Sequence, residues 1–244
     1  MNDYREKIYR KYVTLGLRER VNVTKEQLEQ MARWYEKAIG PFLPKDKETK
    51  ILDLGCGHGT FLYFLKKEGY RNILGIDISP EQTDLAKKIG IYEVKCQGVL
   101  QFLKNTTEKF DIITAFDVIE HFHKDELLSF VELVSKALNS HSGVFILRTV
   151  NGESPFAGRY RYWDFTHEIC FTRTSIFTIL LNAGFEKAKV LPAYHYFPRG
   201  LRSNIKYALW KMIELGLRIY MMAETGNFKD GYIFTQNLLA IGYK

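Results

Sequence analysis

The sequence predicts a doubly wound α/β fold, in which helices cover both faces of a sheet. From residue 50 onward, short apolar runs alternate with amphipathic segments of helical period. The apolar runs are almost continuously hydrophobic, as strands of a parallel sheet are when both of their faces are buried. A chain of 244 residues, 46% of them hydrophobic, is long enough to bury such a core.

Local signals mark the predicted elements. Ser79 and Pro80 are typical of an N-cap and a first helical turn, and Gly184 is typical of a helix end. The predicted strands lie at residues 50–55, 72–77, 91–96, 110–116 and 143–150, near 187–192, and within 232–243. The predicted helices of this part of the chain lie at residues 61–69, 81–90, 124–139 and 172–185.

The chain divides into an N-terminal cap and a main domain. Residues 1–49 are expected to be helical with a linker, because Thr24 and Gln27 form a capping-box pattern and Gly40–Pro41 ends the helix that follows. Residues 50–244 are expected to form the main domain, with a helical insertion at about 199–225. Between these elements, residues 151–171 follow neither period, which predicts an irregular loop of functional importance.

Charge and cysteine content limit the partners and the compartment. The 35 Lys and Arg against 28 Asp and Glu give a net charge of +7, which favours an anionic partner such as a phosphosugar, a lipid surface or a nucleic acid. No Lys/Arg run resembles a nucleic-acid tract, so no nucleic-acid partner is expected. Three cysteines without C-x-x-C spacing predict neither disulfides nor a zinc site. A charged amino terminus and the lack of an 18-residue apolar run predict a cytoplasmic protein.

A glycine-rich stretch lies between the first strand and the next helix, where backbone N–H groups and the helix dipole face a ligand. A dinucleotide site would follow Gly55 and Gly57 with glycine at Thr60, but the third glycine is Gly59. Asp53 would repel a pyrophosphate but would pair, directly or through water, with an ammonium group. The stretch therefore favours a ligand whose carboxylate meets N–H groups and whose amine meets Asp53.

A second acid completes this ligand. Asp77 ends the second strand, at the position where a carboxylate accepts both hydroxyls of a ribose in doubly wound folds. An amino acid joined to a ribose indicates S-adenosylmethionine.

These motifs resemble those of the class I S-adenosylmethionine-dependent methyltransferases. The resemblance spans roughly residues 30–190 and implies a Rossmann-like sheet of seven strands with the last one antiparallel. It also implies that S-adenosylmethionine is the methyl donor and S-adenosylhomocysteine the product. The motifs that carry it are Asp53-x-Gly55-x-Gly57-x-Gly59, the segment 75–79 with Asp77, and residues 110–122.

The resemblance implies specific cofactor contacts. Ile78 is expected to pack on adenine, and Phe116 and Asp117 are expected to line the methionine end. Where the family often has an acid for the adenine amine this chain has Val99, so the backbone around Val99 and Leu100 is expected to hold adenine. The expected cofactor-binding set is Asp53, Gly55, Cys56, Gly57, Gly59, Asp77, Ile78, Val99, Leu100, Phe116 and Asp117.

Methyl transfer to a hydroxyl requires a group that takes the acceptor proton. His121 after the fourth strand and His167 after the fifth are the candidates, because open α/β sheets bind ligands at these strand ends. Asp164 is expected to orient His167. A structural role for His121 stays open. No metal is expected, with a site formed by His121, His123, His167 and Glu168 as the alternative.

The segment 151–171 is similar to that of a subgroup found in bacterial surface-glycan and lipid biosynthesis, through N-G-x-S-P and R-Y-x-D-F-T-H-E. This similarity implies a sugar, a glycolipid precursor or another small hydroxyl compound as acceptor. Arg159, Arg161 and Tyr162 are expected to bind it, the arginines through a phosphate or carboxylate, unless they are only solvated. The alternatives are transfer to nitrogen or carbon, and a protein that binds S-adenosylmethionine without catalysis.

The late helix carries apolar residues at strict i, i+4 spacing. Three roles stay open for it: packing on the core or over the acceptor pocket, a dimer contact, and peripheral contact with an anionic membrane. The protein is accordingly expected to be a monomer or a homodimer, at the inner face of the membrane in the last case. The predicted stripe consists of Leu201, Ile205, Leu209, Ile213, Leu217 and Met221.

Overall fold

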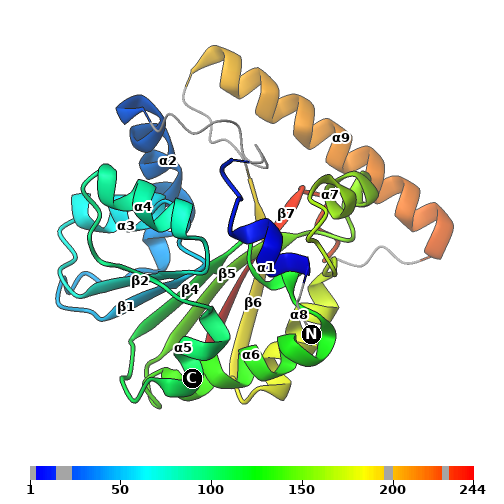
Figure 1. The fold of residues 1–244 in the computed structure, drawn as a ribbon. Coiled ribbons are helices and arrows are strands. Elements are labelled where there is room, and N and C mark those ends of the chain that lie inside the picture. Colours follow the sequence, from blue (N-terminus) through cyan, green and yellow to red (C-terminus); the bar gives the residue numbers. More distant parts are fainter. Residues whose placement is uncertain (1–3, 15–23, 195–199, 227–230) are drawn as a thin grey trace.

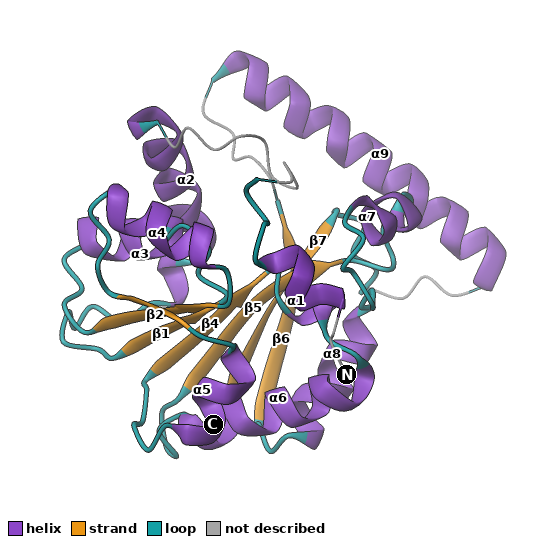
Figure 2. Ribbon diagram, in the orientation of Figure 1, coloured by secondary structure: helices purple, strands orange, loops and turns teal. Residues whose placement is uncertain are grey.

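The structure of the protein is a computed structural model that describes residues 4–14, 24–194, 200–226 and 231–244. A seven-stranded sheet crosses the molecule, with helices on both of its faces (Figures 1 and 2). The strand order is β3-β2-β1-β4-β5-β7-β6, and β7 runs in the opposite direction to the other six strands. The sequence-based prediction of a doubly wound sheet with an antiparallel last strand is therefore confirmed.

All seven predicted strands are present in the described residues. The strands in the first half of the chain are flanked by the turn residues seen in the sequence. β1, β4 and β5 are almost entirely buried because helices cover both of their faces. The strands are β1 Ile51–Leu54, β2 Ile73–Asp77, β3 Val94–Cys96, β4 Ile112–Phe116, β5 Val144–Val150, β6 Lys187–Ala193 and β7 Asn237–Tyr243.

The helices also follow the predicted caps. Thr24 and Gln27 form the expected capping box, and the Ser79 side chain accepts a hydrogen bond from the backbone N–H of Gln82. The helices are α1 Tyr4–Tyr9, α2 Lys25–Ala38, α3 Thr60–Lys67, α4 Pro80–Lys88, α5 Val99–Asn105, α6 Lys124–Ala137, α7 Ala157–Trp163, α8 Arg173–Asn182 and α9 Leu201–Thr225. Two short 3-10 helices are η1 Gly40–Phe42 and η2 Ile119–His121.

Two hydrophobic clusters hold the layers together, one on each face of the sheet. The side chains of α5, α6 and α8 pack on one face, and those of α2, α3 and α4 pack on the other. The carboxyl ends of β1, β2, β4 and β5 remain at one edge, where α1 lies in Figure 1. The functional residues predicted from strand ends therefore gather at this edge.

The structure corrects the sequence-based reading at three places. Residues 151–171 are not wholly irregular, because α7 forms within them. The helix α5 was not predicted, since Val99–Asn105 is only seven residues long and too short to show a helical period. Residue 199, where the predicted insertion begins, lies outside the described residues.

The late helix α9 forms as predicted, but its apolar stripe does not enter the core. No described residue of α9 is buried, and Leu201, Ile205, Leu209 and Ile213 are each more than half exposed. The alternative in which this stripe packs on the core is therefore wrong for these four residues. No helix of the described chain is long and apolar enough to span a membrane.

Candidate active site

The glycine loop between β1 and α3 adopts backbone conformations that few other residues tolerate. Gly55 and Gly57 have φ angles of +70° and +54°, in the left-handed region that glycine enters without a steric cost. A Cβ atom on Gly55 would also lie 2.4 Å from Cγ2 of Val118. Gly59 has φ of +81° and precedes α3, where an added Cβ would meet Ile91 at 3.1 Å.

The backbone N–H groups of this loop are largely engaged within the protein. Gly55 and Cys56 donate to the carbonyl of Ile76, and Gly57 donates to Oδ2 of Asp77 at 2.8 Å. These three N–H groups are therefore engaged within the protein and do not point to a ligand carboxylate. Their hydrogen bonds instead fix the loop against β2.

Asp77 joins the two loops that follow β1 and β2. Its Oδ2 accepts from the N–H of Gly57, and its Oδ1 accepts from the N–H of Ser79 at 2.8 Å. The carboxylate lines the main cavity from the end of β2, as the ribose assignment requires.

Asp53 lies almost fully buried at the end of β1, with 2% of its surface exposed. The hydroxyl of Thr114 donates to its Oδ1 at 2.7 Å. Burial, assisted by the nearby charge of Asp77, raises the pKa of the Asp53 carboxyl to about 7. A cationic ligand beside it would favour the charged form, so the site suits an ammonium or sulfonium group.

A cavity of about 440 Å³ lies at the carboxyl edge of the sheet, between these acids and α1. It is lined by ten of the eleven residues predicted to bind the cofactor, and Gly59 is the exception. Gly59 acts through the chain geometry at the start of α3 and not by contact. The ten are Asp53, Gly55, Cys56, Gly57, Asp77, Ile78, Val99, Leu100, Phe116 and Asp117.

The apolar wall of the cavity contains the residues that were expected to hold adenine. Ile78 is 42% exposed although it follows a buried strand, and it lines the cavity together with Val99 and Leu100. The side chain is thus available to pack on a flat apolar group.

Asp117 is held at the end of β4 by a bidentate ion pair with Arg148 of β5. Arg148 Nε donates to Oδ1 at 2.9 Å, and its Nη2 donates to Oδ2. Asp117 is the one described non-glycine residue with positive φ, at 58°, a conformation that requires support from its surroundings. The guanidinium also lies 4.9 Å from the ring of Trp34, so α2 helps to fix this wall.

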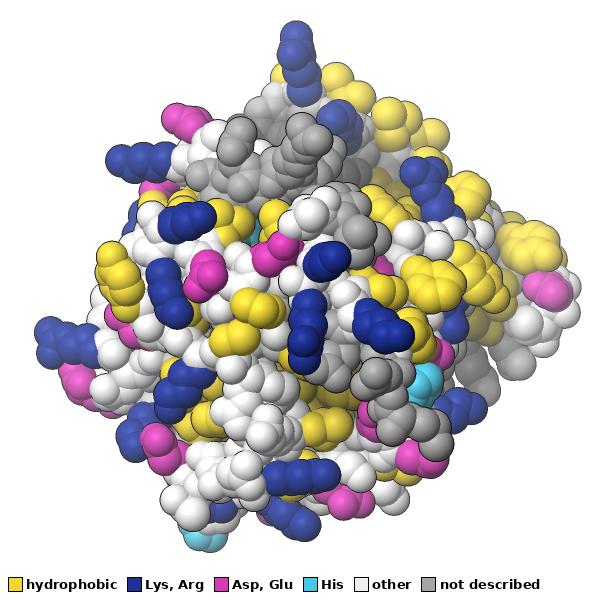
Figure 3. Space-filling view, viewed as in Figure 1, with side chains coloured by type: hydrophobic (Ala, Val, Ile, Leu, Met, Phe, Trp, Pro, Cys, Tyr) yellow, Lys and Arg dark blue, Asp and Glu magenta, His cyan; other side chains and the backbone are white. Residues whose placement is uncertain are grey.

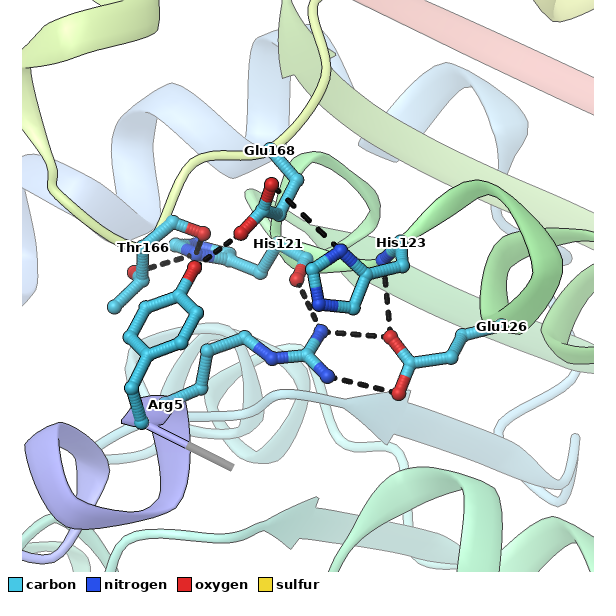
Figure 4. A network of polar contacts seen from close by, with 7 residues as sticks. Arg5, His121, His123, Glu126, Thr166 and Glu168 are labelled. Atoms are coloured by element: carbon cyan, nitrogen blue, oxygen red, sulfur yellow. Dashed lines mark hydrogen bonds and ion pairs between the residues drawn. The ribbon is translucent and has the colours of Figure 1, made fainter. Parts of the chain in front are cut away.

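The N-terminal segment covers part of the cavity, with Arg5, Tyr9 and Tyr12 in its lining. Arg5 pairs with both carboxylate oxygens of Glu126, at 2.7 and 2.8 Å, and also donates to the carbonyl of His121 (Figure 4). At its other end, the N–H groups of residues 13 and 14 donate to Glu81 of α4. The segment is therefore fastened on both sides of the cavity.

The two histidines after β4 and β5 lie together, with ring centroids 4.8 Å apart. His121 lines the cavity, whereas His167 is not among the residues that line it. Burial, followed by the charge of His167, lowers the pKa of His121 to about 4, so its ring is neutral at physiological pH.

Asp164 orients His121 and not His167, which corrects the predicted pairing. Its Oδ1 accepts from the hydroxyl of Thr166 at 2.7 Å, and this hydroxyl lies 2.8 Å from Nδ1 of His121. The Nδ1 atom of His167 instead lies 2.9 Å from the carbonyl oxygen of Tyr160. The hydrogen-bonded chain thus runs from carboxylate to hydroxyl to the imidazole that faces the cavity.

The predicted acceptor-binding residues of α7 are not part of the cavity. Tyr162 is 79% exposed, Arg159 is exposed, and Arg161 donates to the carbonyl of Glu168 at 2.7 Å. None of the three lines the cavity in the described structure. Direct binding by these residues at the cavity is not supported, because their side chains lie elsewhere.

Several residues that shape the site were not predicted from the sequence. Arg5, Tyr9 and Tyr12 follow the i, i+4, i+7 spacing of one helical face, a signal that was readable but not used. Arg148 is a charged residue within an otherwise apolar strand. A charged residue at such a position is expected to have a partner. Glu120 was missed although it is adjacent to His121 in the chain.

The chain is similar to known proteins in sequence and in structure. A family model described as "Methyltransferase domain" matches residues 24–190. The chain belongs to this methyltransferase family. Its sheet order, its glycine loop and the acid at the end of β2 are those of the class I S-adenosylmethionine-dependent enzymes, and S-adenosylmethionine is the cofactor.

Individual relatives cover part of this methyltransferase. It is 33% identical over 111 residues to a ubiquinone biosynthesis O-methyltransferase of Actinobacillus pleuropneumoniae, covering 42% of this chain and 46% of that protein. It is 25% identical over 133 residues to a cyclopropane-fatty-acyl-phospholipid synthase of Escherichia coli, covering 52% of this chain and 33% of that protein. The chain thus spans less than half the length of these curated relatives.

A solved structure agrees over most of the chain. A SAM-dependent methyltransferase from Archaeoglobus fulgidus superposes with a TM-score of 0.65 at 19% identity, covering 89% of this chain and 94% of that one. This likeness supports the fold of the methyltransferase.

We expect Asp77→Ala to weaken binding of S-adenosylhomocysteine by roughly 100-fold, because two hydrogen bonds to a charged acceptor are worth about 3 kcal/mol together. Isothermal titration calorimetry measures the affinity. Asp84→Ala on the exposed face of α4 is the matched control and should bind like the parent. An unchanged affinity in Asp77→Ala would refute the ribose assignment.

We expect the affinity for S-adenosylhomocysteine to fall roughly tenfold as the pH decreases from 7.0 to 5.5. The pKa of Asp53 is about 7, so the carboxyl is increasingly protonated below that pH and loses its attraction for the ligand ammonium. Calorimetry at several pH values measures this slope. Asp53→Asn should bind more weakly and with a much smaller slope; an equal slope in both proteins would assign the pH dependence to another group.

Proposed function

We propose that the protein transfers the methyl group of S-adenosylmethionine to a hydroxyl of a small molecule, in the narrower case a sugar or a glycolipid precursor. The observation that supports transfer to oxygen is the position of His121. It lines the cavity at the end of β4, and Asp164 holds it through Thr166. An alcohol must lose its proton during attack, and a positioned base accelerates such a step by about 10² to 10⁴.

The tautomer of His121 follows from its partners. Its Nδ1 lies 3.3 Å from the carbonyl oxygen of Thr166, and a carbonyl oxygen only accepts hydrogen bonds. Nδ1 therefore carries the hydrogen, and Nε2 has the free electron pair that takes the acceptor proton. Asp164 stabilises the positive charge that develops on the ring, as a carboxylate does behind other catalytic histidines.

The chemistry requires mainly alignment. S-adenosylmethionine supplies an activated methyl group on a sulfonium, which leaves as a neutral thioether. The residues of the chain hold the two reactants in line: Asp53 and Asp77 at the cofactor, and the aromatic rings of Tyr9 and Tyr12 over the cavity. Such alignment contributes up to about 7–11 kcal/mol in well-oriented systems.

The site favours a small acceptor. The N-terminal segment is fastened to Glu126 on one side of the cavity and to Glu81 on the other, so it narrows the entrance. A relative named as an O-methyltransferase supports transfer to oxygen for this chain. Transfer to nitrogen or carbon, and binding without catalysis, are the alternatives.

The acceptor can be found with S-adenosylmethionine labelled in its methyl group. The protein is incubated with fractionated sugar and lipid extracts, and the labelled product is identified by mass spectrometry and by the chemical shift of its methyl group. A methyl ether is the expected result. Label on nitrogen or carbon, label in RNA or DNA, or tight cofactor binding without any labelled product would each overturn the proposal.

We expect His121→Ala to lower kcat for this product by about 10² to 10⁴, while the affinity for S-adenosylhomocysteine changes less than about threefold, because the lost group acts on the acceptor proton. Steady-state kinetics and calorimetry measure the two quantities. His141→Ala, an exposed histidine before β5, is the control and should retain the parent activity. Full activity of His121→Ala would show that no base is required at this position.

We also propose that α9 makes a peripheral contact with an anionic membrane, which would bring lipid-linked acceptors to the cavity. The polar side of this helix faces the rest of the protein. Lys211, Glu214 and Arg218 form ion pairs on this side, at 2.8 and 2.9 Å. The exposed side carries apolar side chains, which gather along α9 in the space-filling view (Figure 3). They are Leu201, Ile205, Leu209, Met212, Ile213, Leu215, Ile219, Tyr220 and Met222.

Charge supports a lipid surface as the occupant of this face. The exposed residues of α9 that are charged at neutral pH are Arg202, Lys206 and Glu224, so cations exceed anions, and the whole chain carries +7. A helix with an apolar face and basic flanks binds at the interface of anionic bilayers. A relative named for a fatty-acyl phospholipid is consistent with this role.

We expect the protein to sediment with vesicles of anionic phospholipid, and the triple variant with Ile205, Leu209 and Ile213 each changed to Ser to bind at least tenfold more weakly. The reason is that burial of each such side chain is worth about 1.5–3 kcal/mol at most. Tyr92→Ser, which removes an exposed aromatic ring before β3, is the control. No vesicle binding, with a concentration-dependent dimer that the triple variant abolishes, would assign this face to a second copy of the chain.

A further inference from the structure

Three side chains of metal-ligating type lie together beside the cavity. Glu120, His121 and His167 each offer one ligand atom, and these atoms all lie within 4.8 Å of one another. Glu120 and His121 belong to η2 after β4, and His167 follows α7. We propose that these three residues bind a divalent transition-metal ion, with Zn²⁺ the best fit to the donor set, and that this ion binds the acceptor hydroxyl. The second part rests on the proposed function.

Both imidazoles have the tautomer that metal binding needs. His167 Nδ1 lies 2.9 Å from the carbonyl oxygen of Tyr160, so it carries a hydrogen and donates it. His121 has the same arrangement with the carbonyl of Thr166. Nε2 of each ring is therefore the atom with a free electron pair. Histidines that bind metals usually donate their other N–H in this way, which fixes the orientation of the ring.

Glu120 supplies the carboxyl oxygen of the site. The residue is 1% exposed, and its Oε2 accepts one hydrogen bond from the hydroxyl of Thr149 at 2.9 Å. Among the described residues, no Lys or Arg forms an ion pair with it. Burial and the charge of Asp117 raise the pKa of this carboxyl to about 8, and the charge of Arg148 only partly offsets them. A metal ion at the neighbouring histidines would stabilise the ionised carboxylate further.

The donor set indicates the class of ion. Two imidazole nitrogens and one carboxylate oxygen are typical of catalytic zinc and related transition-metal sites, which leave a further position open, whereas Mg²⁺ prefers oxygen ligands. Ligand atoms at 2.0–2.1 Å from a tetrahedral ion lie roughly 3.3 Å apart. The ligand atoms, which lie within 4.8 Å of one another, would have to move closer together when an ion binds. The alternative set of the sequence analysis is corrected here, since His123 and Glu168 pair with each other at 3.7 Å.

The open position gives the ion a role in methyl transfer. A hydroxyl bound there would lose its proton far more readily, as zinc lowers the pKa of bound water to about 7. The O–H bond breaks and the proton leaves to solvent; the oxygen then forms a bond to the methyl carbon while the carbon–sulfur bond breaks and its electron pair returns to sulfur. The products are a methyl ether, S-adenosylhomocysteine and a proton. With the ion bound, Nε2 of His121 is a metal ligand, so this role replaces that of a base at the same atom.

Cobalt(II) in place of zinc tests the site without an acceptor. The full chain is treated with a chelator, dialysed, and titrated with Co²⁺ alone while d–d absorption is recorded. We expect one equivalent to bind with an intense visible band, and proton NMR of the complex should show two exchangeable, paramagnetically shifted N–H signals, one from Nδ1 of each histidine. Weak octahedral absorption, or the absence of these two signals, would overturn the proposal.

Variants assign the ligands. His167→Ala and Glu120→Gln should each weaken Co²⁺ binding at least tenfold and change the spectrum, as loss of a metal ligand does. His123→Ala, an exposed histidine outside the cluster, should leave both unchanged. A spectrum in His167→Ala equal to that of the parent would refute the assignment.

Calorimetry with S-adenosylhomocysteine on the metal-free parent separates the two proposals. Cofactor binding together with absent cobalt binding refutes the metal site alone, and absent cofactor binding refutes the proposed function alone. If Glu120→Gln loses cofactor binding through misfolding, the two N–H signals of the parent still decide the question.

Discussion

The carboxylate of Asp77 is the constraint on which the rest of the site depends. It accepts hydrogen bonds from Gly57 in the loop after β1 and from Ser79 in the loop after β2, so it fixes two loops that parallel pairing has already brought to one edge. The glycine φ angles are needed because the loop must turn back far enough for Gly57 to reach this acid. The loop is therefore shaped by the protein itself before any ligand arrives, which reduces the entropy lost when a cofactor binds.

Two acids placed so close together create a demand for positive charge. Burial and the charge of Asp77 both disfavour the ionised form of Asp53, and the hydroxyl of Thr114 only partly offsets them. A ligand with a sulfonium and an ammonium group relieves this penalty, whereas a pyrophosphate would increase it. Charge and burial therefore distinguish this cavity from a dinucleotide-binding site more strongly than the glycine spacing does. The spacing depends on one residue of a motif, whereas charge and burial are properties of the whole cavity.

The strands, the main helices and ten residues that line the cavity were predictable, since strand burial and helix caps are local signals and parallel topology gathers strand ends. The spacing of Arg5, Tyr9 and Tyr12 indicates a shared helical face, but it does not show that this face covers the cavity, because Arg5 is placed by Glu126, which is distant in the chain. Asp164 was correctly singled out but paired with the wrong histidine, since the choice depends on how Thr166 is oriented. Arg159 and Tyr162 were assigned to the acceptor because they crowd the same segment; the turn that begins α7 directs them outward.

The end of β4 and the segment after β5 meet at His121, and two chemical roles are open to the same Nε2 atom. A base must be able to hold a proton, yet the pKa of His121 is lowered to about 4 by its burial, which makes it a weak proton acceptor at neutral pH. Asp164 offsets this only through an intervening hydroxyl, so its stabilisation of a positive ring is less direct than that of a carboxylate bonded to the imidazole. Deprotonating an alcohol at this edge therefore calls for additional positive charge close to the oxygen. The residues adjacent to His121 are of the types that hold such a charge in place.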